Sequence, residues 1–175
     1  VREGRRDFAG WDESKHPRHP EGDDKGGEFA PSESTDDPRT WPRMKVEPDK
    51  LYDLYHVTSD VGNLASISTE GFVPGKTSMM GDDSSFGHVF FTKSRAQADS
   101  IAGQMRGSDA NPAILQLRLL GRHLSGLSPR VDQRMGVDDS IAVLPNTKVL
   151  LGGLLSVYAP KGASVPTKWR ERVSV

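Results

Sequence analysis

Cysteine is absent from this chain of 175 residues, which excludes disulfides, thiolate metal sites and a cysteine nucleophile. No apolar run approaches the roughly 20 residues that a membrane-spanning helix needs, so the sequence predicts no membrane partner. An excess of one charge sign is also lacking, because 23 basic and 24 acidic residues leave a net charge of -1. No global field therefore draws the chain to nucleic acid or to anionic lipid. The Walker phosphate loop, the Gly-x-Gly-x-x-Gly turn and the Gly-x-Ser-x-Gly elbow are missing as well.

The first fifty residues lack isoleucine and leucine, yet they hold six of the twelve prolines. Such a segment cannot bury enough apolar surface to offset the entropy of ordering it, so we predict that residues 1–49 form a flexible arm or linker. The N-terminal residues lack the apolar region of a signal peptide, and a start at Val1 without Met suggests a processed or trimmed chain. Widely spaced aromatic side chains in such an arm usually have no partner, but they can anchor it to a partner surface: Phe8, Trp11, Phe29 and Trp41.

Apolar and alternating patterns predict one folded domain over residues 50–160, followed by a basic C-terminal tail at 161–175. Strands outnumber helices and the two helices fall early, which favours an α+β fold over a parallel sheet. Strands are expected at 51–58, 88–92, 114–120, 140–144 and 149–158, the last with a bulge at Gly152-Gly153.

The two expected helices lie between the first three strands. Asp60 can cap the first helix, and Gly71 ends it. Ser94 is a good N-cap for the second helix, which should run to about Met105. A loop at 73–87, rich in Gly, Ser, Asp and Met, separates the first helix from the second strand.

Five histidines are candidates for chemistry. His16 and His19 lie in the expected arm without further ligands nearby, so we predict no metal site. His56 ends an apolar strand and is followed by Thr58 and Ser59, which gathers three hydrogen-bonding side chains at a strand-to-helix turn. The residues alone leave two interpretations open. One is a functional site, and the other is a buried structural histidine beside a helix cap.

Three segments carry a family resemblance through their order. Leu54–Thr58 is a strand with His56 near its end, Asn63–Phe72 is a helix that ends in Gly-Phe, and Gly87–Ala102 is an aromatic strand followed by a helix with spaced alanines. Together they resemble the NAD-binding half of the ADP-ribosyltransferase superfamily, and most of all its His-Tyr-Glu branch and the small rifampicin ADP-ribosyltransferases. The resemblance implies a split β-sheet with two early helices that binds NAD as a substrate.

The resemblance implies a role for each residue at the end of the first strand. His56 matches the family histidine whose ring hydrogen-bonds the nicotinamide ribose. Val57 stands where the family usually has glycine, so its backbone would meet the nicotinamide amide while its β-branch would crowd the pocket. Thr58, with Ser59 beside it, matches the hydroxyl residue that helps to hold the ribose or adenosine side.

The second strand is expected to complete the NAD cleft. Phe90 falls where the family has a tyrosine that stacks on nicotinamide, and phenylalanine keeps the stacking surface but loses the hydroxyl. Phe91, Thr92 and Ser94 belong to the strand end that shapes the same cleft. The loop at 73–87 would then be a mobile flap over NAD.

The third family motif is a glutamate, sometimes an aspartate, at the start of a later strand, where it stabilises the transition state as nicotinamide leaves. Asp138, Asp139 or Ser140 falls at that position here, and Asp139 is the better candidate because it directly precedes the strand expected at 140–144. Aspartate is one methylene shorter than glutamate, and a misplacement of ~1 Å can cost about a hundredfold in rate. The alternative is an ordinary turn, in which aspartate is common.

The expected arm has a resemblance of its own. Trp11–Arg18, closing with Gly27–Ala30, is similar to a short segment of tailed-phage head and portal-associated proteins. It implies a phage or prophage protein, located in the virion or the host cytoplasm, whose arm has phage head proteins as partners.

These observations favour a mono-ADP-ribosyltransferase that moves ADP-ribose from NAD to a protein, nucleic-acid or small-molecule acceptor, a host protein among the candidates. A catalytically decayed virion structural or interaction module on the same fold is the alternative that Val57, Phe90 and the missing glutamate favour. An RNA 2′-phosphotransferase shares this fold but should have a basic pocket. The nearby arginines show no matching pattern: Arg95, Arg106, Arg118 and Arg122.

Overall fold

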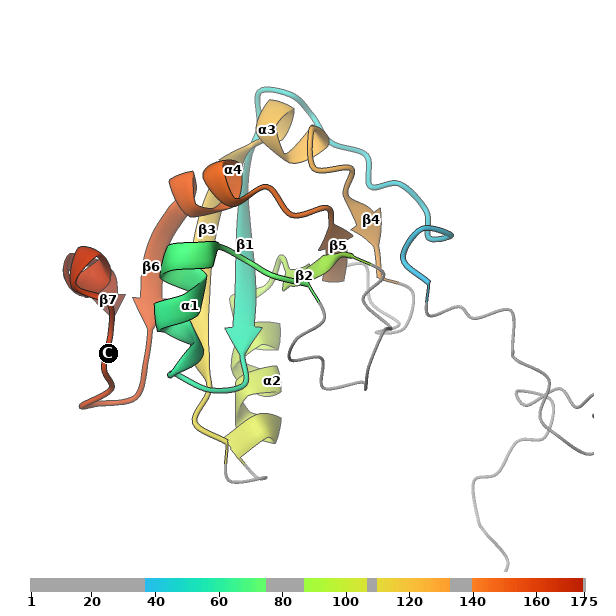
Figure 1. The fold of residues 1–175 in the computed structure, drawn as a ribbon. Helices are drawn as coiled ribbons and strands as arrows, with labels where there is room; N and C mark the ends of the chain where they lie inside the picture. Colours follow the sequence, from blue (N-terminus) through green and yellow to red (C-terminus); the bar gives the residue numbers. More distant parts are fainter. Residues whose placement is uncertain (1–36, 75–86, 107–109, 133–139, 175) are drawn as a thin grey trace, which may run out of the picture. The chain divides into compact units, whose positions relative to one another are not determined.

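The computed structural model describes residues 37–74, 87–106, 110–132 and 140–174 (Figure 1). The chain divides into two units, Val1–Thr35 and Asp36–Val175, and all of the described residues belong to the second. Everything below concerns that second unit alone.

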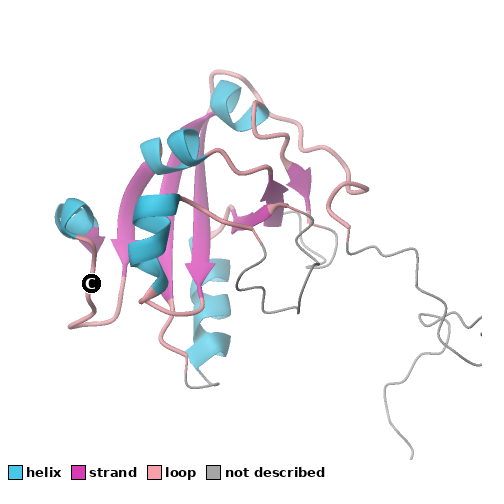
Figure 2. Ribbon diagram, viewed as in Figure 1, coloured by secondary structure: helices cyan, strands magenta, loops and turns pink. Residues whose placement is uncertain are grey.

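The second unit is an α+β domain built on a seven-stranded sheet with the strand order β4-β5-β2-β1-β3-β6-β7 (Figures 1 and 2). Neighbouring strands are antiparallel except β6 and β7, which are parallel. The predicted α+β class is therefore confirmed. The strands are β1 (Leu51–Thr58), β2 (Val89–Thr92), β3 (Ala113–Leu120), β4 (Arg130–Val131), β5 (Ser140–Val143), β6 (Leu154–Tyr158) and β7 (Val173–Ser174). The helices are α1 (Asn63–Glu70), α2 (Arg95–Arg106), α3 (Gly121–Ser125), α4 (Thr147–Gly152) and the 3-10 helix η3 (Thr167–Arg172).

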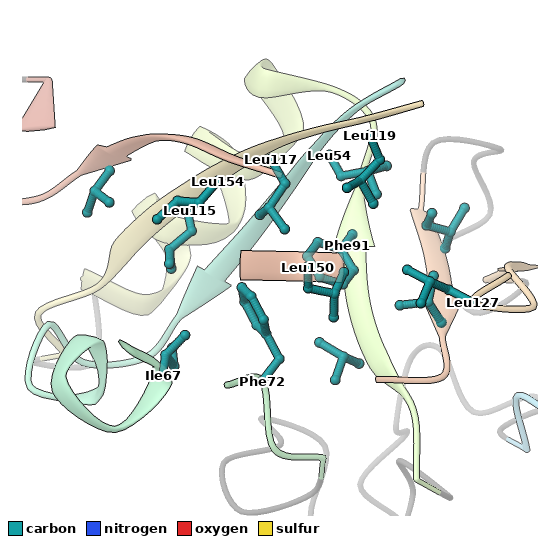
Figure 3. Packing of buried hydrophobic residues seen from close by; sticks show 14 of the residues in the cluster. Leu54, Ile67, Phe72, Phe91, Leu115, Leu117, Leu119, Leu127, Leu150 and Leu154 are labelled. Carbon is teal, nitrogen blue, oxygen red and sulfur yellow. The ribbon is translucent and has the colours of Figure 1, made fainter. Parts of the chain in front are cut away.

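The two faces of the sheet carry different side chains because successive residues of a strand point to opposite sides. On one face, Leu54 of β1 joins a large apolar core with α1, α4 and η3 (Figure 3). On the other face, Tyr55 and Val57 pack with Ala98 and Ala102 of α2. Helices α1 and α2 therefore cover opposite faces of the same strands.

The pairing along the sheet is uneven. β1 pairs with β3 over eight residues, and β2 pairs with β5 over four. Within the described part of the chain, the pairing of β1 with β2 is limited to Tyr55 with Thr92. The strands thus form two well-paired groups, β4-β5-β2 and β1-β3-β6-β7, that meet at this one pair. We call this boundary the β1–β2 seam.

The prediction of one strand over 149–158 was wrong. The first part of that range lies in helix α4, and β6 begins only at Leu154. Asn146 caps α4, because its side-chain oxygen accepts the Val149 N–H at 3.2 Å. Gly153 then allows a close approach to β3, since an added Cβ would lie 2.3 Å from Leu119 Cδ2. The register shift lies not at the glycines but between the pairs Gln116–Ser156 and Leu117–Leu154, where Leu155 of β6 is the extra residue.

Residues 37–49 belong to the same unit as the sheet, although the sequence predicts an arm as far as residue 49. Trp41 is fully buried, and its carbonyl accepts a hydrogen bond from Arg130 Nη1 at 2.8 Å. The backbone continues along the edge of β4, where Arg43 bridges to Arg130. Composition alone did not indicate this contact, because it depends on a strand almost ninety residues further along the chain.

The C-terminal segment also packs on the domain. Trp169 of η3 is buried in the main core, next to strands that are remote in sequence. Lys168 Nζ donates to the Ser68 carbonyl of α1, and Arg172 Nη1 donates to the Leu154 carbonyl of β6. The basic residues of this tail therefore include donors to backbone acceptors of the domain, a role that a sequence pattern does not reveal.

Candidate functional site

His56 lies on β1 beside the β1–β2 seam. Its Nδ1 is 2.9 Å from the carbonyl oxygen of Phe90 on β2. A carbonyl only accepts hydrogen bonds, so Nδ1 must carry the hydrogen and donate it. The neutral ring then has its lone pair at Nε2, and no residue in the described part of the chain hydrogen-bonds that atom. His56 therefore joins the two strand groups through one nitrogen and offers an acceptor at the other.

Two phenylalanine rings surround the His56 ring. The Phe72 ring stands nearly perpendicular to it, with the centroids 5.1 Å apart and an interplanar angle of 85°. The Phe91 ring is tilted at 5.5 Å from His56, and it is also 5.5 Å from Phe72. Edge and tilted contacts of this kind are favourable for aromatic rings. Figure 3 shows Phe72 and Phe91 within the main core.

The turn after α1 places Phe72 in this cluster. Gly71 ends the helix, as predicted, with a φ of +86° that other residues rarely adopt. A Cβ at this position would lie 2.2 Å from Oγ1 of Thr147, the first residue of α4. Glycine therefore permits both the backbone turn and the contact between α1 and α4, and Phe72 enters the core directly after it.

Burial lowers the pKa of His56 below its ordinary value of 6.5, and the hydrogen bond to the Phe90 carbonyl opposes that shift in part. At neutral pH the imidazole is accordingly uncharged. An uncharged ring is what gives Nε2 its role as a hydrogen-bond acceptor.

Val57 and Phe90 do not share the face of the sheet on which His56 lies. Val57 packs on the opposite face, against the cluster of Ala98, Ala102 and Ile114, so its β-branch is directed away from the His56 ring. The Phe90 ring contacts the Trp41 ring, with centroids 6.1 Å apart. The aromatic ring of β2 beside His56 is therefore that of Phe91. Strand alternation explains the difference, because Phe90 and Phe91 must point to opposite sides.

Thr58 and Ser59 follow His56 at the turn into α1. The buried Thr58 hydroxyl donates to the Asp60 carbonyl at 3.1 Å and accepts from Asn63 Nδ2 at 2.9 Å. These bonds hold the turn, while Ser59 is half-buried. Asp60 does not cap α1 directly: the N-cap is Gly62, whose N–H donates to the Asp60 carboxylate at 2.6 Å.

Thr92, at the end of β2, belongs to a polar cluster with the first turn of α2. Ser94 caps this helix as predicted, since its hydroxyl accepts the Gln97 N–H at 3.3 Å. The Thr92 hydroxyl donates to Gln97 Oε1 at 2.8 Å, and Gln97 Nε2 donates to the Ser140 hydroxyl at 3.2 Å. The sequence offers Ser140 only as an alternative to Asp138 and Asp139 for the third family position, and it assigns no role to Gln97. Its only signal was the Ser-x-x-Gln spacing of a capping box.

The predicted carboxylates, Asp138 and Asp139, lie outside the described residues. The described part of β5 begins at Ser140, which pairs with Thr92. No cluster of three histidine or acidic residues suited to a metal ion occurs among the residues that the structure describes. None of the described helices has the length and apolar character needed to cross a bilayer.

Comparisons with protein-family models, with curated proteins and with solved structures found no match to this chain. The functional interpretation therefore depends on the residues of the seam and on the resemblance given above.

Proposed function

We propose that the domain binds NAD at the β1–β2 seam and transfers its ADP-ribose to an acceptor. The observation that carries this proposal is the state of His56. Its Nδ1–H is engaged by the Phe90 carbonyl, and burial keeps the ring neutral, so Nε2 is a fixed acceptor. A ribose hydroxyl is a donor that such an acceptor suits, which agrees with the role implied by the family resemblance.

The pairing pattern supports the same location. β1 and β2 share one described residue pair, whereas each is extensively paired on its other side. A sheet divided in this way is what the split-sheet resemblance leads one to expect. Phe72 and Phe91 add apolar ring surfaces beside His56, and a nicotinamide ring is a planar group that such surfaces favour. In this proposal Phe91 takes the stacking role that the sequence assigned to Phe90.

The proposed reaction breaks the bond between the nicotinamide nitrogen and the ribose C1′, and nicotinamide leaves with the bonding electron pair. Positive charge develops on the ribose, and an acceptor nucleophile then bonds to C1′ and loses its proton. His56 would hold the ribose through Nε2. A carboxylate near the ribose stabilises the developing charge, and Asp139 is the residue proposed for that role.

A second candidate is a structural or interaction module on the same fold, in the virion if the arm resemblance holds. The contacts of His56 favour this candidate too, because they are those of a structural residue. Nδ1 bonds the Phe90 carbonyl, and the Phe72 and Phe91 rings pack against the imidazole. The RNA 2′-phosphotransferase interpretation is weaker. Two arginines that a basic pocket would use are paired with carboxylates, Arg118 with Asp53 and Arg95 with Asp99.

The decisive experiment follows nicotinamide release from NAD by the full chain and by His56→Asn. The asparagine Nδ2 can occupy the place of histidine Nδ1 and keep the bond to the Phe90 carbonyl, but it has no group at the place of Nε2. We expect release by the unsubstituted chain, and a loss of about a hundredfold or more in His56→Asn at an unchanged unfolding midpoint. His123→Asn, an exposed change on α3, is the matched control.

If the unsubstituted chain neither binds NAD nor releases nicotinamide, the enzyme proposal is rejected and the structural module is favoured. Full activity of His56→Asn would assign His56 to structure alone. Asp139→Asn tests the proposed carboxylate separately, with Asp138→Asn beside it. Transfer of labelled ADP-ribose to protein, nucleic acid or a small molecule would then identify the acceptor class and separate a transferase from a simple NAD hydrolase.

A further inference from the structure

Gln97 forms a polar link between two strand ends from a third element, α2. Its Oε1 accepts from the Thr92 hydroxyl at 2.8 Å, and its Nε2 donates to the Ser140 hydroxyl at 3.2 Å. Thr92 and Ser140 are both buried, with 2% and 5% of their surfaces exposed. Buried hydroxyls need such partners, because an unpaired one keeps the full cost of its removal from water. The carboxamide therefore satisfies one end of β2 and one end of β5 together.

This arrangement departs from the one that local sequence favours. Ser94 and Gln97 have the spacing of a capping box, in which the glutamine side chain would accept the N–H of Ser94. Here the Thr92 hydroxyl accepts the Ser94 N–H at 3.2 Å, and the Gln97 carboxamide is directed to the strands. The first half of the box is kept, since Ser94 still caps Gln97. The second half has been replaced by a tertiary contact.

The contact is placed at the β1–β2 seam. Thr92 is the residue through which β2 pairs with Tyr55 of β1, and on its other side it pairs with Ser140 of β5. His56 follows Tyr55 directly and bonds the carbonyl of Phe90, two residues before Thr92. Gln97 therefore holds Thr92, the β2 residue at which the two strand groups pair. The carbonyl that orients the His56 ring lies two residues earlier on the same strand.

We propose that Gln97 is a positioning residue of the NAD site: by holding Thr92 and Ser140 it fixes where His56 stands relative to the start of β5. This role rests on the proposed function. Gln97 itself needs no contact with NAD, because it acts through the two strand ends. Loss of its bonds should loosen the geometry needed in the transition state more than the binding of NAD.

The test compares Gln97→Met with Gln104→Met, a change of the same kind at an exposed position of α2. Methionine keeps the length and bulk of the side chain but makes neither bond. We expect kcat for nicotinamide release to fall by about 10- to 100-fold in Gln97→Met with KM changed by less than about threefold, since a small misplacement mainly affects the reacting geometry. Gln104→Met should match the unsubstituted chain.

Two further variants separate positioning from general structural support. Gln97→Glu can accept from both the Thr92 and Ser140 hydroxyls, so it should recover a large part of kcat. If Gln97 acts through Thr92, the double variant Gln97→Met/Thr92→Val should lose less activity than the two single losses combined, because both changes remove the bond between Thr92 and Gln97. Additive losses would mean that Gln97 does not act through Thr92 and would overturn that route.

Hydrogen exchange gives a readout that is independent of NAD turnover. In Gln97→Met, amides of β2 and β5 should exchange at least about tenfold faster while those of β3 and β6 stay unchanged, because only the seam is loosened. Equal acceleration in all four strands, or unchanged kcat in an active chain, would overturn the positioning role alone. Failure of the unsubstituted chain to act on NAD would overturn both this role and the proposed function.

Discussion

At the scale of single residues, the two nitrogens of His56 respond differently to protonation. Nδ1 carries hydrogen in both forms of the ring, so the bond to the Phe90 carbonyl persists in the imidazolium. Protonation instead removes the acceptor at Nε2 and places a charge in a desolvated ring. Acid should therefore weaken NAD binding and fold stability at the same residue while the bond across the seam remains.

The pH dependence of stability follows from the direction of the His56 pKa shift. Burial lowers the folded pKa below 6.5, so just below pH 6.5 the unfolded chain binds more protons than the folded one. The free energy of unfolding should then fall as pH drops through 6.5 toward the lowered folded pKa of His56. Urea unfolding at several pH values measures this.

His56→Asn should flatten that part of the profile, because asparagine does not titrate, whereas His123→Asn should leave it in place. Asp53 acts lower on the pH scale, since its hydrogen bond with Arg118 holds its pKa below 3.8. Its contribution is lost only as pH falls from 3.8 through that lowered value, well below the pH of 6.5 at which the His56 effect begins. An unchanged slope in His56→Asn would contradict the assignment to His56.

At the scale of elements, the sequence predicted best where local periodicity and caps agree. Strands β1 and β3 form where apolar runs predicted them, and α2 begins directly after Ser94 and buries Ala98, Ala102 and Met105. The helix α4 was missed because its apolar run also suits a strand. The deciding features were the Asn146 cap and the close approach of Gly153 to β3, and the second is a contact across the fold.

The end of α1 offers a matched pair of glycine substitutions. Gly71→Ala should lower the free energy of unfolding by about 2–4 kcal/mol, because its backbone conformation suits glycine and the new Cβ would meet Thr147. Gly103→Ala, in the open interior of α2, should raise it by about 0.5–1 kcal/mol through helix propensity. Urea unfolding of both variants checks the pair, and equal effects would contradict the account of the Gly71 turn.

The candidate site was predictable only in part, because the register between strands decides which side chains meet. A strand-ending His56 was visible in the sequence, and so was an aromatic second strand. Which aromatic ring meets His56 depends on the parity of Phe90 and Phe91 relative to the seam, and single-strand patterns do not fix that register. The role of Gln97 was hidden behind an ordinary capping signal.

At the scale of the whole domain, segments that look unstructured by composition supply buried anchors. Trp41 and Trp169 are each isolated aromatics in polar stretches, yet they are 0% and 4% exposed. Their partners lie far along the chain, so no window of sequence contains both sides of the contact. Composition therefore underestimates how much of the chain belongs to the domain at both ends.

Trp41→Ala tests the N-terminal anchor. Removal of a fully buried indole that packs on Phe90 should lower the free energy of unfolding by about 3–5 kcal/mol. Trp11→Ala, in the segment predicted to be an arm, should change it by less than about 0.5 kcal/mol. Chemical denaturation of the full chain measures both, and similar losses in the two variants would show that the arm boundary needs to move toward the N-terminus.

The Arg172 contact protects the edge of β6 against pairing with a strand from another copy of the domain. Among the described residues, β6 pairs with β7 at Val157 and Tyr158, and Arg172 donates to the carbonyl of Leu154 further along the same edge. An incoming strand would need that carbonyl, and beside it Leu155 is 42% exposed. The charged guanidinium thus occupies a backbone acceptor that an added strand would need. A chain shortened before Arg172 would leave the β6 edge unpaired, and we expect it to aggregate through that edge.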